Sequence, residues 1–234
     1  MKNNTLIELK GVWKTYRMGK VQVHAIRGTS LKIEKGEFVA ITGASGSGKS
    51  TMMHLVGCLD TPSQGSILLE GEDILSLSRS QLAGIRGKKI GFVFQQFNLI
   101  TTLTALENVM LPMEFQESLG DMKSRAKKLL ELVGLKDRMF HKPTELSGGQ
   151  AQRVAIARSL ANDPEIILAD EPTGNLDSKT GQYIMDFLYD FYKKEGKTVI
   201  TVTHDLELAR FAKRIIQLKD GKIEKEIHKH KNGG

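Results

Sequence analysis

The segment Gly43-Ala44-Ser45-Gly46-Ser47-Gly48-Lys49-Ser50-Thr51 fits the pattern G-x-x-x-x-G-K-[ST], which is typical of a loop that wraps the phosphates of a nucleotide. Its glycines allow a tight curl in which successive backbone N–H groups face inward and attract an anion. Lys49 adds a positive charge for the β- and γ-phosphates, and the Ser50 hydroxyl can bind Mg²⁺. An accidental Ser/Gly turn is the alternative, and the flanking sequence argues against it.

Apolar residues on both sides of this segment predict a strand before it and a helix after it. Phe38-Val39-Ala40-Ile41 is a short apolar run, as expected of a buried strand. After the loop, apolar residues suited to a helix occur at Met52, Met53, Leu55, Val56 and Leu59. The N-terminus of such a helix adds its own attraction for phosphate. The sequence therefore predicts an α/β protein that binds a nucleotide.

The overall composition indicates one large α/β domain. The chain has 234 residues, of which 40% are hydrophobic and 26% charged. Its formal net charge of +7 suits nucleic acid, ATP or an anionic membrane, but the basic residues are spread out, so we expect no nucleic-acid partner. Cys58 is the single cysteine, which excludes an internal disulfide and is typical of a reducing cytoplasm. We expect no signal peptide, because residues 1–5 lack its apolar core, and no membrane span, because no apolar run approaches roughly 18 residues.

Patterns elsewhere predict further strands and a helical part. Residues 6–33 contain short alternating runs that predict edge strands broken at Gly19 and Gly28. Residues 98–134 have a helical pattern that ends at Gly134. From Lys225 onward the chain is polar, and we expect it to be frayed. The remaining predicted elements are buried strands at Ile90–Phe94, Glu165–Ala169 and Thr198–Val202, a helix at Ile184–Phe191, and a hairpin at Ile215–Ile223 that turns at Asp220-Gly221.

Asp170 and Glu171 follow the most apolar of these strands directly. Ligands of parallel α/β sheets bind at the carboxyl ends of the strands. One carboxylate there can hold Mg²⁺, and a second can orient the water that attacks the γ-phosphate. A solvated turn is the alternative, and the phosphate loop makes the catalytic interpretation the stronger one.

Leu146-Ser147-Gly148-Gly149-Gln150 precedes an apolar pattern that predicts a helix. Ser147 and Gln150 have the spacing of a capping box, which by itself explains a helix start. It leaves Gly148 and Gly149 unexplained. Bare backbone at a helix N-terminus is what close approach to a phosphate requires.

These motifs occur in an order that resembles the ATP-binding cassette (ABC) ATPase of a transporter, over about residues 6–224. The resemblance rests on Tyr16, the 43–50 loop, Gln95, Leu146–Gln150, Asp170-Glu171, Asn175-Leu176-Asp177 and His204. Within that family, Gln95–Ile100 and Leu106–Val109 are similar to the lipoprotein-release and macrolide-export (LolD/MacB-like) branch. Ala151, where this branch often has Gln, and Gly174-Asn175 are departures that do not touch the chemistry.

The resemblance implies a P-loop NTPase core (RecA-like, mostly parallel sheet) with an antiparallel β subdomain and a helical insert subdomain. We expect a single domain over residues 1–234. About residues 1–95 and 163–224 form the nucleotide-binding core and β subdomain. About residues 96–162 form the helical subdomain with the signature motif, and 225–234 a polar tail.

The resemblance also assigns roles to single residues. Lys49, Gln95, Glu171 and His204 are the expected catalytic residues, and Ser50, Gln95 and Asp170 the expected Mg²⁺ residues. Gln95 is expected to sense Mg²⁺ and the attacking water, and His204 to contact the γ-phosphate. Tyr16 is expected to stack on adenine. Ser147, Gly148, Gly149 and Gln150 are expected to contact the ATP held by a second copy, with Asp177 near the seam. Without the resemblance, a lone His after a strand is more often structural, and an aromatic residue in a strand is usually packing.

The expected function is that of an ATPase subunit, with ATP and Mg²⁺, that energises a transporter from the cytoplasmic side of the cell membrane. The expected partners are a second copy of the chain and permease subunits encoded separately. An FtsE-like regulatory ATPase that signals through a membrane partner remains an open alternative. A DNA-maintenance ATPase is disfavoured because residues 50–146 lack the sustained heptads of its coiled coil. A translation factor of the same superfamily is disfavoured because such proteins carry two cassettes in one chain, whereas this sequence has one.

Overall fold

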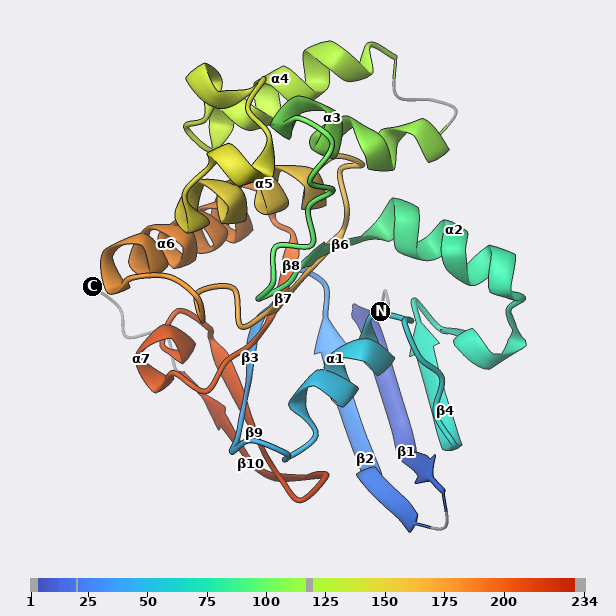
Figure 1. The fold of residues 1–234 in the computed structure, drawn as a ribbon. Coiled ribbons are helices and arrows are strands. Elements are labelled where there is room, and N and C mark those ends of the chain that lie inside the picture. The colour runs from blue at the N-terminus through green and yellow to red at the C-terminus, as the bar shows by residue number, and fades with distance from the viewer. Residues whose placement is uncertain (1–3, 20, 117–119, 230–234) are drawn as a thin grey trace.

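The computed structural model describes residues 4–19, 21–116 and 120–229, which form two sheets and a set of covering helices (Figure 1). The strands are β1 Thr5–Met18, β2 Val21–Glu34, β3 Phe38–Thr42, β4 Gln64–Leu69, β5 Glu72–Asp73, β6 Ile90–Val93, β7 Ile166–Asp170, β8 Thr198–Val202, β9 Arg214–Lys219 and β10 Lys222–His228. The α-helices are α1 Lys49–Val56, α2 Arg79–Lys89, α3 Ala105–Met110, α4 Met122–Leu132, α5 Gly148–Ser159, α6 Ser178–Glu195 and α7 Leu206–Ala209. Short 3₁₀ turns lie at Ile74–Ser76, Leu111–Phe115, Lys136–Arg138 and Pro143–Glu145.

The central sheet has the strand order β10-β9-β3-β8-β7-β6. All its neighbouring pairs are parallel except β9 and β10, which form an antiparallel hairpin. Every residue of β3 and β8 is buried, as expected for parallel strands that are covered on both faces. The mostly parallel core predicted from the sequence is therefore confirmed.

Alternate residues of the central strands enter two separate apolar cores. Phe38 and Ala40 of β3 pack into the core formed with α3, α4, α5 and α6. Val39 and Ile41 of the same strand pack into the core formed with α1 and the antiparallel sheet. Because side chains alternate along a strand, one short apolar run supports structure on both faces of the sheet.

The second sheet is antiparallel and has the order β2-β1-β4-β5. The predicted turn at Gly19 joins β1 to β2, but the predicted break at Gly28 is wrong, because β2 continues to Glu34. Gly28 instead forms a bulge with φ of 63°, and the pairing shifts from Val12–Thr29 to Lys14–Ile26 around it.

The helical lobe contains α3, α4 and α5 and lies at the opposite end of the molecule from β1, β2 and β4 (Figure 1). Asn108 of α3 is fully buried and binds the loop before it: its Oδ1 accepts from the Ile100 N–H at 2.8 Å, and its Nδ2 donates to the Ile100 and Leu103 carbonyls. Gly134 follows α4 with φ of 69°, so the predicted stop is confirmed. None of the helices in the described part of the chain is long and apolar enough to span a bilayer.

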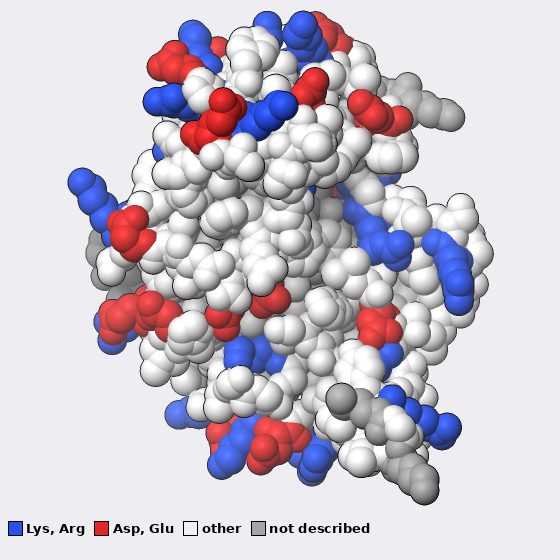
Figure 2. Space-filling view, viewed as in Figure 1, with Lys and Arg blue, Asp and Glu red and all other residues white. Residues whose placement is uncertain are grey.

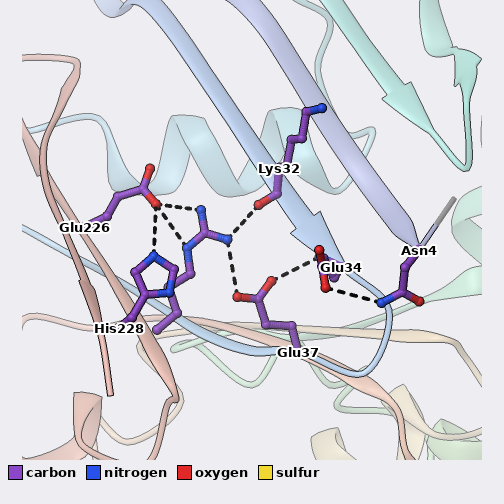
Figure 3. Close-up of polar contacts among 7 residues, drawn as sticks. Asn4, Lys32, Glu34, Glu37, Glu226 and His228 are labelled. Carbon is purple, nitrogen blue, oxygen red and sulfur yellow. Dashed lines mark hydrogen bonds and ion pairs between the residues drawn. The ribbon is translucent and has the colours of Figure 1, made fainter. Parts of the chain in front are cut away.

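The last strand continues past the predicted start of the frayed tail, since β10 runs to His228. Its pairing with β9 is reinforced by Arg214, whose side chain is only 12% exposed. The guanidinium donates to Glu226 Oε2 at 2.6 Å, to the Lys32 carbonyl at 2.8 Å and to Glu37 Oε1 at 3.3 Å (Figure 3, where these partners are labelled). Arg214 thus joins β9 to β10, to β2 and to the start of β3.

Candidate nucleotide site

In the loop between β3 and α1, two positions have a backbone conformation and close neighbours that only glycine can accommodate. Gly43 has φ of 149°, and a Cβ there would come within 2.3 Å of the Leu218 carbonyl oxygen. Gly48 has φ of 102°, and a Cβ there would come within 2.5 Å of the Ala25 carbonyl oxygen. These contacts let β2 and β9 pack directly against the loop. The curl is therefore fixed by its neighbours.

The N-terminus of α1 is open to an anion. Its N-cap is Gly48, which offers no side-chain acceptor to the first N–H groups of the helix. Lys49 is buried, and its Nζ donates to the carbonyls of Gly43 at 2.9 Å and Ala44 at 3.0 Å. The ammonium is held inside the curl, where it and the free N–H groups would meet phosphate oxygens together.

Asp170 lies next to this loop and has the donor chemistry that Mg²⁺ prefers. Burial and the neighbouring charge of Glu171 raise the pKa of the Asp170 carboxyl, while a hydrogen bond with Ser50 opposes the rise. A divalent cation would stabilise the ionised carboxylate further, so Ser50 and Asp170 fit the metal. The described residues contain no cluster of three or more His, Cys, Asp and Glu side chains, so phosphate and water would complete the coordination.

Glu171 and His204 lie together where β7 and β8 end. Asp170 pairs with Val202 across these parallel strands, so the residues that follow in both strands lie at the same edge of the sheet. Glu171 has φ of 43°, and its N–H donates to the Val202 carbonyl at 2.9 Å. His204 Nδ1 lies 3.1 Å from Glu171 Oε1, and the His204 side chain is 66% exposed. The imidazole can therefore both orient the carboxylate and reach a ligand.

A cleft of about 530 Å³ joins the phosphate loop to Glu171, whereas Asp170 and His204 are not among the residues that line it. It is lined by Gln22, Val23, His24, Ala25 and Arg27 of β2, by Ser45, Gly46, Gly48, Lys49, Ser50 and Thr51, and by Glu171, Asp220 and Gly221. The β2 residues and Asp220 were not predicted from the sequence. They carry no motif, and they reach the loop only because the β1–β2 and β9–β10 hairpins fold onto it.

Tyr16 lies beside this cleft. It pairs with Val23 across the β1–β2 hairpin, and Val23 lines the cleft. Its hydroxyl donates to Asp60 Oδ2 at 2.9 Å, and burial together with this bond raises the pKa of Tyr16. Lys14 Nζ lies 5.1 Å from the ring centroid.

Gln95 does not line the cleft. Its side chain lies against Gly174, where a Cβ would come within 2.8 Å of Nε2. Its carbonyl accepts from Asn175 Nδ2 at 3.0 Å. The expected contact of Gln95 with Mg²⁺ and water would require this side chain to turn toward the cleft.

None of the Ser147–Gln150 segment lines this cleft, and Gly148 instead lines a different groove together with Gln96, Phe97 and Asn175. Ser147 and Gln150 form the predicted reciprocal capping box: Ser147 Oγ accepts from the Gln150 N–H at 3.3 Å, and Gln150 Oε1 from the Ser147 N–H at 2.9 Å. Asp177 caps α6 by accepting from the Thr180 N–H at 3.0 Å, without a reciprocal bond, and it is exposed. The structure does not bring these residues to the phosphate loop of the same chain.

Comparisons with known proteins agree with this geometry. The family model described as ABC transporter matches residues 26–174. An ABC transporter ATP-binding protein of Thermotoga maritima is 54% identical over 94% of both chains. The macrolide export ATP-binding/permease protein MacB of Bdellovibrio bacteriovorus is 52% identical over 94% of this chain, which spans 34% of MacB.

Solved structures give the same result. A dimeric post-hydrolysis state of the ATP-binding cassette MJ0796, bound to ADP and Pi, matches with a TM-score of 0.89 and 50% identity. The match covers 96% of this chain and 99% of that one. MJ0796 is an ABC transporter ATP-binding protein of Methanocaldococcus jannaschii. By its motifs, its fold and its relatives, the chain belongs to the ATP-binding cassettes of the ABC transporter family.

Proposed function

We propose that this chain is the ATP-binding and ATP-hydrolysing subunit of an ABC transporter of the exporter or lipoprotein-release type. One observation carries the proposal: Glu171 lines the same cleft as Lys49 and Ser50 of the phosphate loop. A general base, a phosphate-binding cation and a hydroxyl suited to Mg²⁺ therefore face one space. Family membership supports the ATPase activity itself.

Residues in and beside the cleft have different proposed roles in hydrolysis. The loop N–H groups, the α1 N-terminus and Lys49 bind the phosphates and stabilise the charge that develops on transfer. Ser50 and Asp170 would hold Mg²⁺, which would supply positive charge to offset that of the phosphates. Glu171 orients the attacking water and takes its proton, and His204 holds the Glu171 carboxylate in position at 3.1 Å.

The proposal includes a second copy of the chain. Ser147–Gln150 lies outside the chain's own cleft, so a facing copy would have to supply this segment to each site. Figure 2 shows charged side chains mostly around the rim of one face and few in its middle, over α5 and the loop that follows β7 in the same view of Figure 1. A sparsely charged centre with a polar rim is typical of an association surface. The dimeric MJ0796 structure supports this arrangement.

The proposed membrane partners are separate permease subunits, with this chain bound peripherally on the cytoplasmic side of the cell membrane. MacB supports a link to a permease, because its name describes both an ATP-binding and a permease part.

Steady-state ATP hydrolysis and equilibrium ATP binding test the proposal in the Lys49→Ala and Glu171→Gln variants. We expect Lys49→Ala to lose both binding and hydrolysis. We expect Glu171→Gln to bind ATP normally and to hydrolyse it at least about a hundredfold more slowly, since general bases contribute roughly 10²–10⁴-fold. Lys194→Ala, at an exposed lysine of α6, is the matched control and should retain the parent rate. Hydrolysis at the parent rate in either cleft variant would contradict the proposal.

A further inference from the structure

Gln152 is a buried amide that the proposed mechanism does not use. It lies on α5 and is 0% exposed. Its Nε2 donates to the Pro172 carbonyl at 2.6 Å, and its Oε1 has no hydrogen-bond partner among the residues that the structure describes. A buried acceptor without a partner costs free energy, and an apolar side chain of the same shape would avoid that cost. The hydrogen bond from the Gln152 side chain to the Pro172 carbonyl is therefore the feature that needs an explanation.

The acceptor of that bond belongs to the loop that carries Glu171. Pro172 follows Glu171 directly, and it is buried. Glu171 has φ of 43°, a conformation that residues other than glycine adopt only when the surroundings impose it. The loop is held by the Val202 carbonyl, which accepts from the Glu171 N–H, and by the Gly174 N–H, which donates to the Glu171 carbonyl at 3.0 Å. Gln152 adds a hydrogen bond to this loop from a helix outside the sheet.

The hydrogen bond from Gln152 connects this loop to the helical lobe. α5 packs against α3 and α4, and it begins with the Ser147–Gln150 segment. In Figure 1, α5 lies next to α6, which follows the same loop. Any displacement of α5 that accompanies contact between Ser147–Gln150 and a ligand would thus act on Pro172 through Gln152.

We propose that Gln152 is a positioning residue for Glu171: it links α5 to the loop after β7 and fixes the carboxylate in the orientation that takes a proton from water. The inference rests on the proposed role of Glu171 as general base. Gln152 lies outside the residues that line the cleft, so it acts on the rate of the chemical step and leaves ATP binding unaffected.

The test measures kcat and KM for ATP in Gln152→Met, alone and combined with Glu171→Gln. Met has nearly the shape of Gln and removes both the donor and the unpartnered acceptor. We expect kcat to fall about ten- to a hundredfold, because small misplacements of catalytic groups have effects of this size. KM should stay at the parent value. In the Glu171→Gln background, single-turnover hydrolysis should be insensitive to Gln152→Met, because the carboxylate it positions is already gone.

The control is Gln182→Met, at an exposed glutamine of α6 that bonds only to Asp186 among the described residues. It should retain the parent kcat and KM. Gln152→Met hydrolysing at the parent rate, or losing the same factor in both backgrounds, would overturn the inference while leaving the proposed function intact. Parent-rate hydrolysis by Glu171→Gln alone would instead overturn the proposed function, and the inference with it.

Gln152→Glu gives an independent readout. The ionised carboxylate cannot donate to the Pro172 carbonyl, whereas the protonated acid can. The ratio of its kcat to that of the parent should therefore rise as the pH is lowered, with both proteins folded by circular dichroism. A ratio that is constant or falls as the pH is lowered would contradict the proposed hydrogen bond.

Discussion

At the residue scale, the two glycines that begin α5 are constrained in different ways. A Cβ on Gly149 would come within 2.5 Å of Thr180 Cγ2, so packing within the chain explains this glycine. A Cβ on Gly148 would meet nothing closer than Phe97 Cζ at 3.7 Å, an ordinary contact. Packing within the chain does not explain Gly148. Of the two, Gly148 is the one whose bare backbone remains available to a ligand.

Alanine substitutions separate these explanations. Gly149→Ala should destabilise the protein, because overpacking costs about 1–3 kcal/mol and a helical Gly→Ala change returns at most about 1 kcal/mol. Thr180→Ser removes the clashing methyl group and keeps the hydroxyl that binds Asp177, so Gly149→Ala should be nearly neutral in that background. Gly148→Ala should keep the parent stability and lower ATPase activity. Chemical denaturation and hydrolysis assays check both, and a destabilised Gly148→Ala variant would contradict this account.

Tyr16 should affect affinity for ATP and leave the chemical step unchanged. Stacking of a base on an aromatic ring contributes about 1–3 kcal/mol, so Tyr16→Ala should raise KM for ATP at least several-fold at unchanged kcat. Tyr16→Phe keeps the ring and loses the bond to Asp60, so its KM should stay near the parent value. If Tyr16→Ala left KM unchanged, the ring would be a packing residue of the β1–β2 hairpin.

At the scale of elements, sequence patterns predicted the parallel strands well because these strands are continuous apolar runs. They predicted less well where tertiary contacts decide the outcome. Gly28 suggested a break, but pairing on both sides turns it into a bulge within β2. Helix α2 was missed, because only Leu82 of its residues is buried and its apolar pattern is weak, although Ser78 and Gln81 form a capping box. The tail was expected to fray at Lys225, but pairing with β9 orders it to His228.

The Arg214 cluster tests how the C-terminal hairpin is held. Arg214→Met should destabilise the protein by about 1–3 kcal/mol, less than for a fully buried pair because Glu226 is 32% exposed. The loss arises because Glu37 and Glu226 keep their charges without the guanidinium that binds both. Lys194→Met, which removes an exposed pair with Asp190, should cost no more than about 0.5 kcal/mol. Equal effects of the two changes in urea unfolding would contradict a structural role for the cluster.

The candidate site shows the same division between local and tertiary information. Lys49, Ser50, Asp170 and Glu171 could be proposed from the sequence, because their chemistry requires fixed positions after a strand or in a glycine loop, whereas His204 was proposed only through the family resemblance. Gln22, His24 and Arg27 could not, because their place in the cleft follows from the hairpin that carries them. Gln152 could not either, since its bond to Pro172 depends on how α5 packs.

At the scale of the whole molecule, the central sheet has one structural unit packed on each of its two faces, and each unit carries a different part of the expected ATP site. The core with α1 and the antiparallel sheet supports the phosphate loop, and the core with α3–α6 supports the Ser147–Gln150 segment. These two parts of the expected ATP site do not meet within the chain. In the proposed dimer, a single copy would therefore present half of each of two sites, and ATP held between facing copies would join them.

In the proposed cycle, ATP closes two copies so that Glu171 faces the shared site, and hydrolysis reopens them. In Glu171→Gln, hydrolysis should be slowed at least about a hundredfold and one negative charge near each γ-phosphate is removed, so the closed state should accumulate. Size-exclusion chromatography with light scattering should therefore find a dimer with ATP and a monomer with ADP or without nucleotide. Adding Lys49→Ala to this variant should abolish the ATP-dependent dimer by weakening binding. A Glu171→Gln protein that stays monomeric at saturating ATP would contradict the account.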